Sequence, residues 1–308
     1  MLTRFGVLAV GFALFYGTWV APVNASFSQK LDLQSRVDKR SDRAVRYQYR
    51  ARYYPQFTFD NSWSAHAFAV TGDDFASSHN TVDDGAADYF YLRRLYLRHQ
   101  ASYGKTELGI IPTYKGRVSS SGLSKDGWIA GVRHVRQLDN SSQFEVVVGQ
   151  LNELDPARAF NAPDKLDYVE LEYSARMDKR SSYEFSLERM TEANFIRSEF
   201  RYKFAQEHTV FAEWVKRAEN SQSKLVLGLE GNIVLGQQPI EYFAHYSYVS
   251  PEFGLRAELT EDFLGDGHGM SAELSADIGA TDFAWFVRVD LVEGRSRLLA
   301  GMSWSFRS

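Results

Sequence analysis

Cysteine is absent from the 308-residue sequence, which excludes a disulfide framework and a lipid anchor attached to cysteine. Positive charge is not in excess either: the formal net charge is -4, and no basic tail or stripe is present. A nucleic-acid partner is therefore not expected. Beyond residue 25, no run approaches the roughly 18 apolar residues that a membrane-spanning helix requires. Together with a mean hydropathy of -0.35, this excludes a polytopic helical membrane protein.

The one long apolar run lies at the N-terminus, in residues 1–25. Arg4 supplies a positive charge, a hydrophobic stretch follows, and the run ends in Val-Asn-Ala, which matches a small-residue cleavage site. This order is typical of a signal peptide, and we expect cleavage after Ala25. The alternative is a permanent anchor helix, which the shortness of the run and its interruption by Pro22 disfavour. Residues 26–308 are then expected to form one exported domain.

The exported part alternates with a period of two. Within residues 195–204, for example, charged side chains occupy every second position between mostly apolar ones. That periodicity is typical of a β-strand with one apolar and one polar face. About sixteen such segments are predicted, with fourteen and eighteen as bounds, and almost no helical periodicity is found. The approximate ranges are 27–38, 43–55, 61–71, 88–101, 105–111, 127–138, 143–151, 165–176, 182–189, 195–205, 208–217, 223–234, 239–249, 268–279, 282–292 and 297–306.

The connections between these segments sort by length. The even-numbered joins are short turns, such as residues 102–105 and 279–282. Several odd-numbered joins are long and rich in Gly, Ser, Asp and Pro, as in residues 72–88 and 250–269. Short periplasmic turns, longer extracellular loops and an even strand number are typical of an outer-membrane barrel. We therefore predict an all-β fold, a single transmembrane antiparallel β-barrel.

The two faces of the predicted strands differ in charge. One face is apolar and aromatic, as in Phe283, Trp285, Val287, Val289 and Leu291, and in the later strands it carries no ionisable group apart from tyrosine. A charged side chain facing lipid costs about 2–4 kcal/mol near the membrane midplane, so we assign the apolar face to lipid. The charged face then lines a wet lumen. The alternative is a soluble β-sandwich or β-helix with the apolar face as its core.

The predicted pore-lining residues come from the charged face, with arginines mainly in the first strands and carboxylates mainly in later ones. In one interpretation, opposed basic and acidic walls orient solutes and set selectivity. In the other, neighbouring guanidiniums and carboxylates pair laterally and brace the wall. The candidates are Arg46, Arg50, Arg52, Arg94, Arg98, Arg136, Glu170, Glu172, Glu184, Glu188, Arg197, Arg201, Glu241 and Glu273.

Residues 89–100 (YFYLRRLYLRHQ) do not separate cleanly into two faces. Arg93 and His99 share a face with Leu95 and Leu97, so neither register is free of charge. A β-bulge, or a strand that projects beyond the membrane, would resolve the conflict.

Two stretches resemble known bacterial barrels. The C-terminal residues LLAGMSWSFRS are similar to the insertion signal of outer-membrane barrels, with Gly301, Trp304 and Phe306 at the signal positions. They differ from it in Leu299, where a polar residue is usual, and in the two residues after Phe306. Residues 89–138 resemble a stretch of porin-like and alginate-export-like barrels, in which an LRR strand turns into an LG strand. The resemblance implies insertion by the barrel assembly machinery and a passive conduit for small solutes or saccharides.

We therefore expect a Gram-negative outer-membrane channel for small hydrophilic solutes or saccharides, surrounded by outer-membrane lipid, with no cofactor, metal or catalytic residue. The alternative is a barrel enzyme or adhesin that acts through its extracellular loops. Two groups of residues could serve it, one as a hydrolase pair and one as an aspartyl protease-like or cation site. His268 lies near Ser271, but outer-membrane lipid hydrolases place the two residues two apart rather than three; Asp73 and Asp74 with His79 offer a second candidate. No HExxH or other close metal-ligand spacing is present.

Overall fold

The computed structural model describes residues 25–72, 79–82, 90–112, 128–139, 141–151, 159–160, 162–190, 192–253 and 265–308. These residues form one sheet of seventeen strands. The strands are β1 (Ser26–Arg40), β2 (Arg46–Thr58), β3 (Trp63–Thr71), β4 (Asn80–Thr81), β5 (Phe90–Ala101), β6 (Gly104–Pro112), β7 (Trp128–Gln137), β8 (Ser142–Gln150), β9 (Tyr168–Arg176), β10 (Ser181–Met190), β11 (Ala193–Ala205), β12 (His208–Arg217), β13 (Ser223–Leu235), β14 (Gln238–Val249), β15 (Gly267–Asp277), β16 (Phe283–Val292) and β17 (Arg295–Arg307). In this part of the chain no helix is long and apolar enough to cross a membrane.

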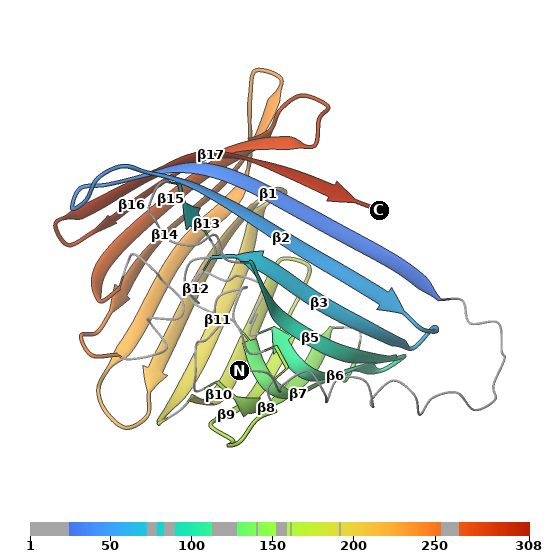
Figure 1. Cartoon of the computed structure of the whole chain (residues 1–308). Coiled ribbons are helices and arrows are strands. Elements are labelled where there is room, and N and C mark those ends of the chain that lie inside the picture. Colours follow the sequence, from blue (N-terminus) through green and yellow to red (C-terminus); the bar gives the residue numbers. More distant parts are fainter. Residues whose placement is uncertain are drawn as a thin grey trace, which may run out of the picture.

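The sheet closes on itself. Every long strand pairs antiparallel with its neighbours in sequence, and β1 also pairs with β17, from Lys30 opposite Arg307 to Arg40 opposite Arg297. Figure 1 shows β1, in blue, beside β17, in red. The two-residue strand β4 pairs with β2 at Gln48 and Tyr49. The other sixteen strands form the barrel, as the sequence predicts.

The short turns share a hydrogen-bonding device. Asp60, Asp139 and Asp178 begin the β2–β3, β7–β8 and β9–β10 turns, and one carboxylate oxygen of each accepts hydrogen bonds from two backbone N–H groups two and three residues further on. These backbone donors hold the pKa of all three carboxyl groups below the ordinary value. We refer to the end of the barrel with these turns as the periplasmic end.

The outer wall is apolar and exposed. Leu227, Met270 and Leu291 retain 47%, 57% and 47% of their accessible surface, while the alternate residues of the same strands turn inward. An exposed apolar band this extensive is stable only in contact with lipid. Aromatic side chains mark its two edges: Trp304 and Phe306 at the periplasmic end, and Tyr246 and Tyr248 toward the other.

A β-bulge resolves the ambiguous register of β5. Phe68 of β3 lies opposite Arg94, but Ala69 lies opposite Leu92, so Arg93 is the extra residue. Arg93 and Arg94 are both buried, at 1% and 8% exposure, and the outward positions after the bulge are Leu95, Leu97 and His99. Of the two solutions that the sequence left open, the structure has the bulge.

Candidate functional site: the barrel lumen

The inner wall carries the predicted pore-lining residues with one exception. On β2, Tyr47 faces outward with 64% exposure and Gln48 is buried, so Arg46, Arg50 and Arg52 share the inward face of Gln48. The same alternation places the others inward: Arg94 and Arg98 on β5, Glu170 and Glu172 on β9, Glu184 and Glu188 on β10, Arg197 and Arg201 on β11, Glu241 on β14 and Glu273 on β15.

Arg136 does not line the lumen. It lies opposite Phe144 on the outward face of β7, and its guanidinium sits 4.3 Å from the ring centre of Tyr103. The position is one residue from the end of the strand, where a long cationic side chain can reach the membrane interface. The inward arginine of β7 is Arg133, which the sequence analysis missed because β7 carries charge on both faces.

Arg197 is the centre of a buried ion cluster that spans four strands. Its guanidinium lies 3.7 Å from Glu172 and 3.2 Å from Glu184, and it donates hydrogen bonds to Glu199 and Glu213. The four carboxylates come from β9, β10, β11 and β12, and the Arg197 side chain has 0% exposure. Removal of this cation would leave several buried carboxylates without compensation, so Arg197 braces the wall.

A second cluster joins β5 to β8. Arg133 lies 3.1 Å from Glu107 and 2.9 Å from Glu145, and Arg98 lies 2.7 Å from Glu107. Each pair links adjacent strands rather than opposite walls. For these arginines the contacts therefore favour lateral bracing.

A basic sector occupies the wall around β1 and β2. Arg36 of β1 donates a hydrogen bond to Gln48 at 2.8 Å, beside the three arginines of β2. The buried ring of His79 contacts Gln34 at 2.8 Å. Around the closed barrel of sixteen strands, β2 and β11 are eight strands apart in both directions and so lie on opposite sides. The basic sector therefore faces the carboxylates of β9 to β12.

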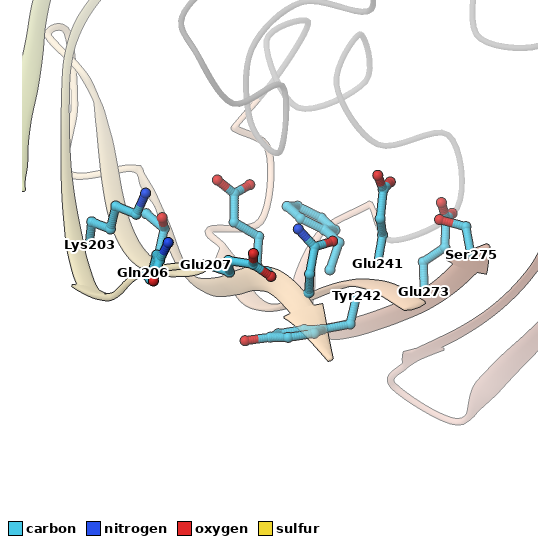
Figure 2. A pocket seen from close by; sticks show the side chains of 12 residues that line it. Lys203, Gln206, Glu207, Glu241, Tyr242, Glu273 and Ser275 are labelled. Carbon is cyan, nitrogen blue, oxygen red and sulfur yellow. The ribbon is translucent and has the colours of Figure 1, made fainter. Parts of the chain in front are cut away.

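A cavity of about 530 Å³ opens into the lumen near the periplasmic turns of β11 to β15. Figure 2 shows Glu241 of β14 and Glu273 of β15 extending in one direction, while Tyr242, the residue after Glu241, points to the other side of the sheet. Lys203 of β11 and Glu230 of β13 line the same cavity. Its polar lining and open form suit water and hydrophilic solutes.

The inner wall is not polar throughout. Toward the extracellular end, inward positions of β6 to β14 form an apolar cluster that includes Ile111, Ile129, Val147, Phe195 and Val215, each at 2% exposure or less. This sector is dry and cannot be water-filled pore lining. The sequence carries a signal for it, since these residues fall on the strand face that is otherwise charged.

The candidate hydrolase pair is separated by the wall. His268 is exposed on the outward face of β15, where its ring contacts Tyr246 and Tyr248, whereas Ser271 is inward and buried. Side chains on opposite faces of one strand cannot form a nucleophile–base pair. For the second candidate, Asp73 and Asp74 lie outside the described residues. Among the residues that are described, no group of three or more metal-ligating side chains could hold a metal ion.

Comparison with known proteins gives a structural match without a sequence match. No family model and no curated protein matches the chain. Among solved structures, a mutant of the Rh. blastica porin aligns with a TM-score of 0.60 at 10% identity, covering 91% of this chain and 100% of that one. Pseudomonas aeruginosa OccK5 aligns with a TM-score of 0.57 at 8% identity, and the alignment covers 92% of this chain and 98% of that one. A loop-deletion mutant of OmpT, an outer-membrane protein of Vibrio cholerae, aligns with a TM-score of 0.54 at 11% identity, and the alignment covers 92% of this chain and 99% of that one.

The chain has the fold of an outer-membrane porin. The exposed apolar band of this porin-fold barrel fits a lipid bilayer, as in the outer-membrane barrels that it resembles. At these identities the similarity establishes the fold alone. The arrangement of charged groups in the lumen is a property of this chain's own residues.

Proposed function

We propose that this barrel is a passive outer-membrane channel for small hydrophilic solutes or saccharides. The observation that carries the proposal is a closed wall of sixteen strands on which most charged side chains point inward. A barrel of this size leaves an aqueous passage when its interior is not filled. The dry apolar cluster occupies one side of the extracellular half, so the passage follows the basic sector on the other side.

The selectivity filter of this channel is the arginine ladder of β2. Arg46, Arg50 and Arg52 are two or four residues apart on one face, so successive guanidiniums are about 7 Å or more apart along the strand. Arginine stays charged at any working pH. Across the lumen, the carboxylates of β9 to β12 are held by Arg197, so the two walls differ in charge and act on a solute between them. Anions and acidic saccharide groups are expected to pass close to β2.

Planar-bilayer recording tests the channel itself. The purified barrel should give discrete ohmic conductance steps, and vesicles that contain it should swell in small sugars. A protein that acts as an enzyme or adhesin through its loops, with a blocked lumen, would conduct little under the same conditions, and that result would reject the channel.

Reversal potentials test the ladder. The triple variant Arg46→Gln, Arg50→Gln, Arg52→Gln should shift selectivity toward cations. The matched control removes three exposed positive charges outside the lumen: Arg136→Gln on the outward face of β7, and Lys179→Gln and Arg180→Gln in the β9–β10 turn. Equal shifts in the two variants, or a shift in neither, would show that the arginines of β2 only brace the wall.

A further inference from the structure

The inward faces of β2, β3 and β5 carry a group of aromatic rings at the periplasmic end of the arginine ladder. On β2 the next inward residue after Arg52 is Tyr54, whose ring contacts that of Phe68 on β3 with 4.8 Å between the centroids. In the adjoining row, His66 of β3 lies opposite Tyr96 of β5. These two rings stack, with their planes 5° apart and their centroids 4.9 Å apart. We call Tyr54, His66 and Tyr96 the aromatic platform.

Neighbouring side chains hold the platform in place. Tyr96 lies between Arg94 and Arg98 on the inward face of β5, and Arg98 donates a hydrogen bond to its hydroxyl at 3.2 Å. Phe68, which supports Tyr54, has 1% exposure and lies under Arg94, whose guanidinium is 4.0 Å from the ring centre. The three rings of the platform, by contrast, all retain part of their accessible surface. The platform is therefore preorganised, and the surface that it keeps faces the lumen.

The charges around the platform favour an anionic solute. Asp32 and Glu107 lie near it, and each is bound to a cation: Asp32 is 2.7 Å from Lys30, and Glu107 is 2.7 Å from Arg98. The ammonium group of Lys30 also lies 5.4 Å from the ring centre of Tyr54. A carboxylate of the wall that is already bound to a cation repels a passing anion less than an uncompensated one.

A neutral ring face beside a fixed cation suits a sugar that carries an acid group. The face of an aromatic ring is the negative part of its quadrupole, so it attracts the C–H bonds of a sugar ring that lies flat on it. Arg52 precedes Tyr54 by two residues on the same face, about 7 Å along the strand, and guanidinium binds carboxylate strongly. We propose that the platform is a stacking subsite for a sugar acid, with the pyranose ring on Tyr54 and His66 and the carboxylate at Arg52. This inference rests on the proposed channel function and specifies its solute.

Block of the ionic current in planar bilayers tests the subsite with three probes of equal carbon number. Glucuronate has the ring and the carboxylate, glucose has the ring alone, and gluconate has the carboxylate on an open chain. Glucuronate should block the wild-type channel at the lowest concentration. Tyr54→Leu keeps apolar bulk but removes the ring face, so it should raise the half-blocking concentration of glucuronate about fivefold and leave that of gluconate unchanged. Tyr54→Phe keeps the ring and should retain wild-type block.

The matched control is Tyr47→Leu, which removes a ring from the outward face of the same strand and should leave block by all three probes unchanged. Heat-modifiable mobility confirms that each variant is folded, and His66→Leu provides a second loss of ring surface if Tyr54→Leu does not assemble. Equal block of the wild type by glucuronate and gluconate, or equal glucuronate block of the wild type and the ring-removed variant, would overturn the subsite and leave the channel in place. A folded wild-type barrel that does not conduct would instead reject the channel, and the subsite with it.

Discussion

Replacement of Arg197 by Gln separates a bracing arginine from one that acts on solutes. Arg197 has 0% exposure and contacts carboxylates on four consecutive strands, of which Glu213 also has 0% side-chain exposure. Removing one partner of a buried ion pair costs about 3–5 kcal/mol, because the remaining charges lose their compensation. The same change at Arg50, in the basic sector, should cost less than about 1 kcal/mol.

Urea unfolding of vesicle-inserted protein, followed by heat-modifiable mobility, measures the difference. A loss of about 3 kcal/mol corresponds to roughly a hundredfold change in the unfolding equilibrium, since 1.4 kcal/mol is a factor of ten. Adding Glu213→Gln to the Arg197→Gln background should recover part of the loss by removing one uncompensated charge. If Arg197→Gln is as stable as Arg50→Gln, or if the second substitution destabilises further, the cluster does not brace the wall.

Val287→Lys should block assembly, since it places a charge at mid-strand on the lipid face at a cost of about 2–4 kcal/mol. Ser275→Lys on the inward face and Ala280→Lys in a turn should be tolerated, and equal yields of folded barrel from all three variants would mean that the faces are reversed. Asp178→Asn should be less stable than the wild type at neutral pH. The backbone N–H groups at Arg180 and Ser181 lower the pKa of the folded carboxyl, so this stabilisation is present above the unfolded pKa of about 4 and lost as pH falls through the folded pKa. Urea unfolding midpoints of the wild type and Asp178→Asn, measured at pH 7 and pH 3, test this prediction. The difference between the two proteins should be smaller at pH 3, and a difference of the same size at both pH values would contradict it. Intact mass should place the mature N-terminus at Ser26, and retention of residues 1–25 would contradict the proposed signal.

Strand positions were predictable from the sequence because the period-two pattern and the turn residues agree. All sixteen predicted segments are confirmed, and the predicted range of β12 matches its observed bounds. The faces were also predictable, because the cost of a charge in lipid leaves the outward positions free of one. Outward charges do occur near strand ends, where the interface is close and the cost is small, as at Arg136 on β7 and Lys216 on β12.

Inward positions were harder to interpret, because polar and apolar side chains are both stable there. Ile129 and Val215 fall on the otherwise charged face of their strands, but alternation within one strand does not show that such residues of neighbouring strands pack together into one cluster. The two-residue strand β4 is too short to produce a pattern. The partners of Arg197 are set by the pairing register of four neighbouring strands. Alternation within a single strand does not specify that register.

Closure of the barrel has a consequence for how the chain folds. The hydroxyl of Ser305 donates a hydrogen bond to Asp32 at 2.6 Å across a sequence separation of 273 residues. Contacts so distant in sequence form slowly, because a large loop must close first. Until β17 arrives, β1 and β16 present open edges that can pair with other chains. A chain cut short before β17 would keep those two edges permanently, so loss of the last thirteen-residue strand would yield an aggregating product rather than a smaller barrel.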